Sequence, residues 1–203
     1  MEINLNVEGD PGTGNSYNKT TIDKVGNYNS NVRDVYNNYY TQSESRLGGW
    51  FRRLNEEINN DIRLQKKLDD IKCYRTKMRH TIGLEAKLKD GGFSQSAIVK
   101  AQRLKMFFAK KSMRFQYYES AQRIDIYLFA KICHRFDTYI LPNIESLPLI
   151  EINQMVYEMV VRPIVDEINA NGSCDRHLCY TEDDIFGMLY YLTGNCHINW
   201  KEY

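Results

Sequence analysis

An octapeptide near the start of the chain, GDPGTGNS at residues 9–16, comes closest to a known chemical motif. It matches the phosphate-binding loop G-x-x-x-x-G-K-[ST] at every defined position except one, because Asn15 stands where the loop needs its lysine. A working loop also joins a buried parallel strand to a helix. Here the preceding run from Glu2 to Glu8 alternates polar and apolar residues, and the residues that follow form a poor helix start. The pattern predicts a turn without a bound nucleotide or other cofactor.

Cysteines and histidines near the C-terminus are of the types that bind zinc. Three of them precede a predicted helix and two follow it: Cys174, His177 and Cys179, then Cys196 and His197. About twelve helical residues, each rising 1.5 Å, separate the two groups by roughly 18 Å. We therefore interpret them as buried structural cysteines and surface histidines and predict no metal within one chain. A metal shared between two chains stays an open alternative.

A basic stripe lies on the predicted second long helix. Between Phe93 and Tyr118 there are six basic residues and no acidic ones. With 3.6 residues per turn, five of them project within an arc of about 100°, and these are the predicted nucleic-acid contacts: Lys100, Arg103, Lys110, Lys111 and Arg114. Phe107 lies close to the arc, where an aromatic ring could stack on a base. The alternatives are a solvated face or pairing with residues 145–184, which carry nine acidic residues.

No catalytic residues are predicted. His134 and Asp137 are spaced to orient one another on a helix, but no serine or cysteine nucleophile beside a glycine turn accompanies them. The acidic pairs Glu56-Glu57 and Asp69-Asp70 stand among basic residues and are typical of a solvated helix surface. The sequence therefore favours a protein that is not an enzyme.

The composition is that of an ordinary globular protein. The 203 residues are 42% hydrophobic, carry a net charge of +1, and contain no apolar run of the roughly 20 residues that a membrane span needs. The five cysteines are odd in number and scattered, which favours a reducing, cytoplasmic location.

Two regions differ in pattern. Residues 1–46 are rich in Asn, Thr, Tyr and Gly, and Ile3, Leu5 and Val7 alternate with polar residues, which predicts an extended arm with a β-hairpin. Residues 47–203 show helical spacing and are predicted to form an α-helical bundle. An isolated hairpin is marginally stable in water, so the arm must dock on the helical body, pair with another chain or be largely disordered.

The predicted bundle contains about four to five helices, two of them long. Apolar residues recur at steps of three and four from Leu47 to a stop at 90–92, and Ser94 caps a second stretch that continues to Pro142. A third helix begins at Pro148 and ends at 171–172, with a kink or break expected at Pro163. The last predicted helix begins at a capping box, Thr181 to Asp184.

Both ends of the chain resemble a set of uncharacterised bacterial proteins. The N-terminal segments that carry the resemblance are Val7-Glu-Gly-Asp-Pro-Gly-Thr-Gly-Asn15 and Val25-Gly-Asn-Tyr-Asn29. The C-terminal segment is Tyr190-Tyr-Leu-Thr-Gly-Asn-Cys-His-Ile198 with Trp200. Those proteins look like cargo of mobile elements in anaerobic gut bacteria. The resemblance covers about forty residues and implies no activity, cofactor or site.

Together these patterns favour a helical protein that acts through protein–protein contacts. Because a marginal, Asn-rich hairpin is suited to pairing with another chain by strand addition, we predict self-association through the arm. Nucleic-acid binding through the basic stripe is the alternative.

Overall fold

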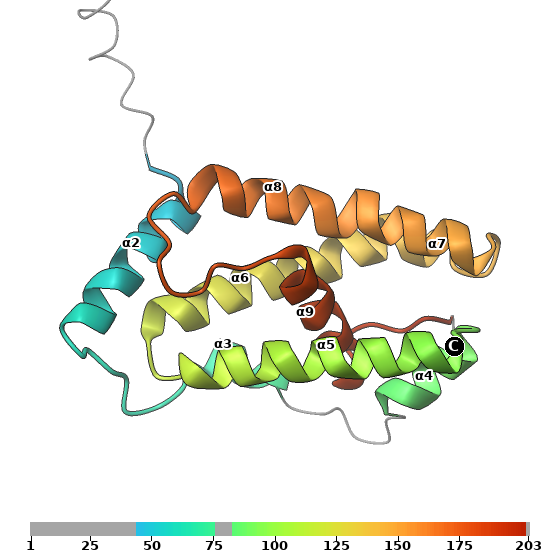
Figure 1. The fold of residues 1–203 in the computed structure, drawn as a ribbon, viewed down its shortest axis with the longest axis horizontal. Coiled ribbons are helices and arrows are strands. Elements are labelled where there is room, and N and C mark those ends of the chain that lie inside the picture. Colours follow the sequence, from blue (N-terminus) through green and yellow to red (C-terminus); the bar gives the residue numbers. More distant parts are fainter. Residues whose placement is uncertain (1–43, 76–82, 202–203) are drawn as a thin grey trace, which may run out of the picture. The chain divides into compact units, whose positions relative to one another are not determined.

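The computed structural model describes residues 44–75 and 83–201, and all regular structure in these ranges is helical (Figure 1). The chain separates into two units, residues 1–42 and 43–203, of which the second contains the described residues. The predicted mainly α fold is confirmed. The β-hairpin arm and the turn at residues 9–16 lie outside the described residues.

The first predicted helix is interrupted. Helix α2, Arg46–Asn59, begins at Ser45, whose hydroxyl accepts a hydrogen bond from Gly48 N at 3.0 Å. It ends at an Asn-Asn-Asp run in which Asp61 adopts a positive φ of 52°, a conformation that Asn and Asp tolerate better than other side chains. Two short helices follow, α3 at Asp69–Arg75 and α4 at Leu84–Asp90. The prediction of one continuous helix was therefore wrong.

The second predicted helix is also divided in two. Helix α5, Gln95–Arg114, and helix α6, Glu119–Arg135, are separated by a turn in which Leu64 N donates to Tyr117 O at 2.7 Å. This bond comes from a segment more than fifty residues away, so the local pattern does not reveal the turn. A π-helical segment, Phe136–Ile140, and a short 3₁₀ turn, Leu141–Asn143, extend α6.

The third predicted helix is continuous through its proline. Helix α7, Leu149–Met155, runs through a π-helical segment, Val156–Val161, into helix α8, Arg162–Asn171. Pro163 lacks the N–H that would bond Met159 O in an α-helix. That carbonyl accepts instead from Arg135 Nε on α6. Of the two expected outcomes, a kink or a break, the break does not occur, and the chain instead changes helical register and bonds to a neighbouring helix.

Helix α9, Glu182–Gly194, occupies the centre of the bundle between α5 and α8 (Figure 1). Its predicted capping box is confirmed, since Thr181 N donates to Asp184 Oδ2 at 2.9 Å. Gly187 allows close packing on α5: a Cβ there would lie 2.7 Å from Leu104 O. The core around α9 consists of fully buried side chains from several helices: Phe51, Phe108, Phe129, Met188, Leu189 and Leu192.

Candidate interaction site

One side of helix α5 is packed into the core and the opposite side faces solvent. Ser94 caps the helix, its hydroxyl accepting from Ala97 N at 3.3 Å. The buried side carries Ile98, Ala101, Leu104, Phe108 and Ser112. Successive residues of a helix are about 100° apart, so seven side chains of α5 point away from this buried stripe. We call them the α5 face: Val99, Arg103, Met106, Phe107, Lys110, Met113 and Arg114.

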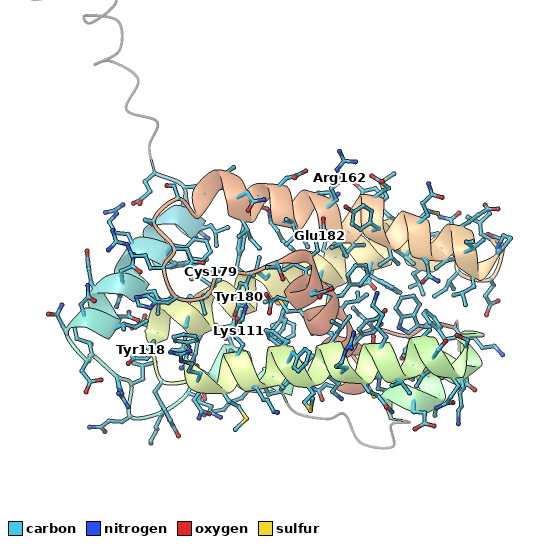
Figure 2. All side chains as sticks on the ribbon, viewed as in Figure 1. Lys111, Tyr118, Arg162, Cys179, Tyr180 and Glu182 are labelled. Atoms are coloured by element: carbon cyan, nitrogen blue, oxygen red, sulfur yellow. The ribbon has the colours of Figure 1, made fainter. Side chains whose placement is uncertain are left out.

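The predicted basic residues fall into two groups. Four are exposed, on the α5 face or at its edge: Lys100, Arg103, Lys110 and Arg114. Lys111 is half-buried and turned toward α9, where its Nζ lies 2.8 Å from Asp184 Oδ2 and 5.2 Å from the centre of the Tyr180 ring (Figure 2). Its charge is thus compensated within the molecule, as one of the two alternatives for the stripe anticipated.

The α5 face also carries large apolar side chains, which the sequence reading did not include among the site residues, although it placed Phe107 beside the stripe. Val99 is 55% exposed, Met106 44%, Phe107 52% and Met113 61%. Large exposed apolar groups that share one helix face are typical of an interaction surface. Their positions opposite the core stripe were the signal that could have identified them.

A groove runs beside the α5 face, between α4 and α5. Its volume is about 370 Å³, and its walls consist of Gly83, Leu84, Glu85, Gln102, Lys105, Met106 and Ala109. Glu85 lies 2.9 Å from Lys89 Nζ and accepts a bond of 3.4 Å from Gln102. Met106 therefore borders both the exposed face and the groove.

A buried polar network lies on the opposite side of α5. Asp125 on α6 accepts hydrogen bonds from Ser112 Oγ and from the Tyr180 hydroxyl, both at 2.6 Å. Arg75 Nη2 donates to Ser112 Oγ at 2.7 Å and lies 3.9 Å from Asp125 Oδ2. Burial raises the pKa of Asp125, and the bonds from Ser112 and Tyr180 act in the opposite direction. The partners of Asp125 come from three other segments, so the network connects α6 to α3, α5 and the segment before α9.

The acidic pairs and the His134–Asp137 pair do not form a catalytic site. His134 and Asp137 are both exposed, and burial raises the pKa of Asp137 while the nearby His134 lowers it. Glu57, predicted to be solvated, is only 3% exposed. It accepts from Ser120 N at 3.0 Å and Ser120 Oγ at 2.9 Å. That prediction was wrong for Glu57, which joins α2 to α6.

The C-terminal cysteines and histidines have separate surroundings. Cys174 Sγ lies 3.9 Å from Gly48 O, and Asp175 accepts from Cys179 N at 2.7 Å. His197 is half-buried and packs against the ring of Tyr74 at 5.4 Å, and Cys179 is exposed, so the prediction of buried cysteines and surface histidines was wrong for these two residues. Within residues 44–75 and 83–201, no three His, Cys, Asp or Glu side chains are grouped as metal ligands would be. Across the same ranges, no helix is both long and apolar enough to span a membrane.

The chain matches a known protein family over part of its length. Residues 83–200 match the model of C-terminal domain 9 of the ABC-three component (ABC-3C) systems. No curated protein and no solved structure is significantly similar to the chain. The matched range contains the whole α5 face, the groove beside it and the C-terminal segment from Tyr190 to Trp200 that carries the resemblance to uncharacterised bacterial proteins. The N-terminal segments of that resemblance, at residues 7–29, lie outside it.

Proposed function

The chain belongs to the family of C-terminal domain 9 of the ABC-three component systems, which are bacterial, and on this premise we propose that it is a helical docking module. It binds another protein component of its own system through the α5 face. The observation that carries the proposal is the presence of four large apolar side chains, each more than two fifths exposed, on one face of a helix inside the matched range.

The chemistry of the α5 face supports a protein ligand. Interfaces are enriched in aromatic residues, Met and Arg, and depleted in acidic residues at their centres. The face combines Phe107, Met106 and Met113 with Arg103 and Arg114, and contains no carboxylate. In such an interface a few apolar anchors contribute most of the affinity, and the charged residues set orientation.

A binding experiment with purified components tests the proposal. The full chain is mixed with each of the other two components of its system, and complex formation is measured by size-exclusion chromatography with light scattering. The double variant Met106→Glu, Phe107→Glu is expected to weaken the complex by about tenfold or more. Ile150→Glu, which changes the exposed Ile150 on α7, is the matched control. If neither component binds, or if both variants bind as the wild type does, the proposal is wrong.

Nucleic-acid binding is the second candidate, supported by the exposure of Lys100, Arg103, Lys110 and Arg114 along a helix that itself contains no acidic residue. Lys111 is included with less support, because it already pairs with Asp184. Affinity for duplex DNA or RNA should fall steeply with salt and fall again in Lys110→Glu, Arg114→Glu. Nucleic-acid affinity that changes neither with salt nor in the double variant would contradict this function.

The remaining sequence hypotheses stay predictions. Self-association through residues 1–46 predicts a dimer or larger species whose mass, measured by light scattering of the full chain, decreases on dilution. A monomer at every concentration would contradict it. The predicted association with mobile elements agrees with the matched family, whereas the origin in gut anaerobes and the cytoplasmic location remain predictions.

A further inference from the structure

We infer that the ligand of the α5 face is an acidic amphipathic helix of the partner protein, an inference that rests on the proposed function. The arrangement of side chains on α5 repeats every seven residues. Val99, Met106 and Met113 form an apolar row along the helix. A second row contains Arg103 and Lys110, and a third contains Lys100, Phe107 and Arg114.

A seven-residue repeat on an exposed helix face fits a second helix better than an extended chain. Two helices that cross at a shallow angle stay in contact along rows of residues seven apart, with apolar side chains at the seam and charges beside it. The row of Val99, Met106 and Met113 has the composition of a seam, and the two rows with the charges follow one another on one side of it. Residues 44–75 and 83–201 present no strand edge to which an extended segment could add.

Charge determines the chemistry of the partner helix. Four exposed cations lie on or beside the α5 face, and residues 93–118 contain no carboxylate to oppose an acidic ligand. A partner with Glu or Asp beside its apolar seam would pair with Arg103, Lys110 and Arg114. On the other side of the apolar row, Gln102 and Ala109 line the groove between α4 and α5. This side is nearly neutral and accommodates apolar side chains of the partner.

A nucleic acid fits the same surface less well. A phosphate backbone would gain from the cations, but it would cover Val99, Met106 and Met113, which can neither bond to phosphate nor stack on bases as aromatic rings do. An amphipathic helix uses both the cations and the apolar row. The observations therefore favour the protein ligand, and nucleic acid becomes an outcome of the test.

The test uses designed peptides and the full chain. A fluorescein-labelled peptide of about 21 residues, three heptads, carries Leu at the seam positions and Glu beside them. One control peptide has the same composition in scrambled order, and a second has Lys in place of every Glu. Fluorescence anisotropy is expected to show binding of the first peptide only, with an affinity that falls as salt is raised.

Variants of the chain separate the two contributions. One double variant, Arg103→Glu with Lys110→Glu, tests the charges, and the other, Met106→Glu with Phe107→Glu, tests the apolar contacts. Each is expected to reduce peptide affinity by about tenfold or more, whereas the single changes Ile150→Glu and Arg162→Glu on the α7–α8 helix should not. The exposed side chain of Arg162 lies on α8, away from α5 (Figure 2). Circular dichroism melting of each variant verifies that it is folded.

Three results would overturn the inference. The first is equal binding of the scrambled peptide, and the second is tighter binding of duplex DNA of matched charge than of the peptide. The third is self-association of the chain that is lost in the double variant Met106→Glu, Phe107→Glu, which would show that a second copy occupies the face. These results differ from a failure of the proposed function. If the natural components still bind in a way that depends on Met106 and Phe107, the docking function stands and only the acidic helix is excluded.

Discussion

Single buried carboxylates connect distant parts of the chain. Asp125 is 3% exposed and has three cationic or hydroxyl partners, Ser112, Tyr180 and Arg75. Because the Ser112 and Tyr180 hydroxyls are buried, removing the carboxylate would leave both without their acceptor in a low-dielectric core and would remove the counter-charge of Arg75.

Asp125→Ala is therefore expected to lower the free energy of unfolding by about 2–4 kcal/mol. Asp125→Asn keeps one oxygen acceptor at nearly the same volume and should cost less. Urea denaturation followed by circular dichroism measures both, and Asp166→Ala, changed at an exposed position of α8, is the control. Equal stability of Asp125→Ala and the wild type would show that the network does not stabilise the fold.

His197 makes stability depend on pH. Burial lowers its pKa, and the nearby Lys87 acts in the same direction, whereas bonds with the backbone of Cys73 and Tyr74 act in the opposite one. The unfolded chain therefore binds a proton at higher pH than the folded one does. The contribution of neutral His197 is complete above the unfolded pKa of about 6.5 and is lost as pH falls from there through the lowered folded pKa.

The expected outcome is a fall in unfolding free energy on acidification through this window that is smaller in His197→Phe. Urea denaturation at a series of pH values measures it, with His134→Asn, changed at an exposed position of α6, as the control for losing a histidine. A wild-type pH profile that His197→Phe reproduces would assign the dependence to other groups.

The sequence does not reveal which single charged residues are buried. Glu57 follows Glu56 in a run of charged residues, and only the contact with Ser120, 63 positions along the chain, shows that one of the two is buried. Lys111 likewise has the spacing of the basic stripe, and its partner Asp184 lies 73 positions away. Local spacing gives the direction of a side chain from its helix axis. It does not say which other segment lies there.

At the scale of elements, α5 and α9 pack closely because Gly187 has no side chain. A Cβ at this position would lie 2.7 Å from Leu104 O and 2.8 Å from Phe108 Cβ. The first of these atoms is helix backbone and cannot move aside without displacing α5.

Gly187→Ala is expected to destabilise the chain by about 1–3 kcal/mol, in spite of the higher helix propensity of alanine. The matched control is Gly83→Ala, where an added Cβ meets no atom within 4 Å. Thermal denaturation of both variants measures the difference. A Gly187→Ala variant as stable as Gly83→Ala would mean that the two helices separate at little cost.

Helix starts were more predictable than helix continuity. Ser94 and the Thr181–Asp184 box begin helices where the sequence places them, because a cap is a local hydrogen bond. The turn after Phe115 depends on Leu64, and the helix through Pro163 continues because Arg135 bonds the carbonyl that the proline leaves without a donor. Both depend on segments that are far away in the sequence, so periodicity predicted the helical class without these details.

At the scale of the second unit, residues near the two ends of the family range meet. Lys87 on α4 is buried, and its Nζ donates to Ile198 O at 3.1 Å and Asn199 Oδ1 at 2.5 Å. The Trp200 ring packs edge-on against Phe93 at 4.8 Å and Phe136 at 5.2 Å. The C-terminal segment thereby connects α4 to the end of α6. Helix α2 lies before the matched range and still contributes the fully buried Phe51 and Leu54 to the same core.

Trp200 is the last residue of the matched range and packs against Phe93 and Phe136, so its removal should destabilise the core. Trp200→Ala is expected to lower the free energy of unfolding by about 3–5 kcal/mol, since it removes a buried ring and leaves a cavity beside Phe93 and Phe136. Lys201→Ala, one residue further and exposed, is the control. Urea denaturation gives the loss of stability, and peptide binding to the α5 face, measured where the variant is still folded, should be retained because Trp200 lies outside that face. A cost no larger than that of Lys201→Ala would show that the C-terminal segment does not hold the bundle together.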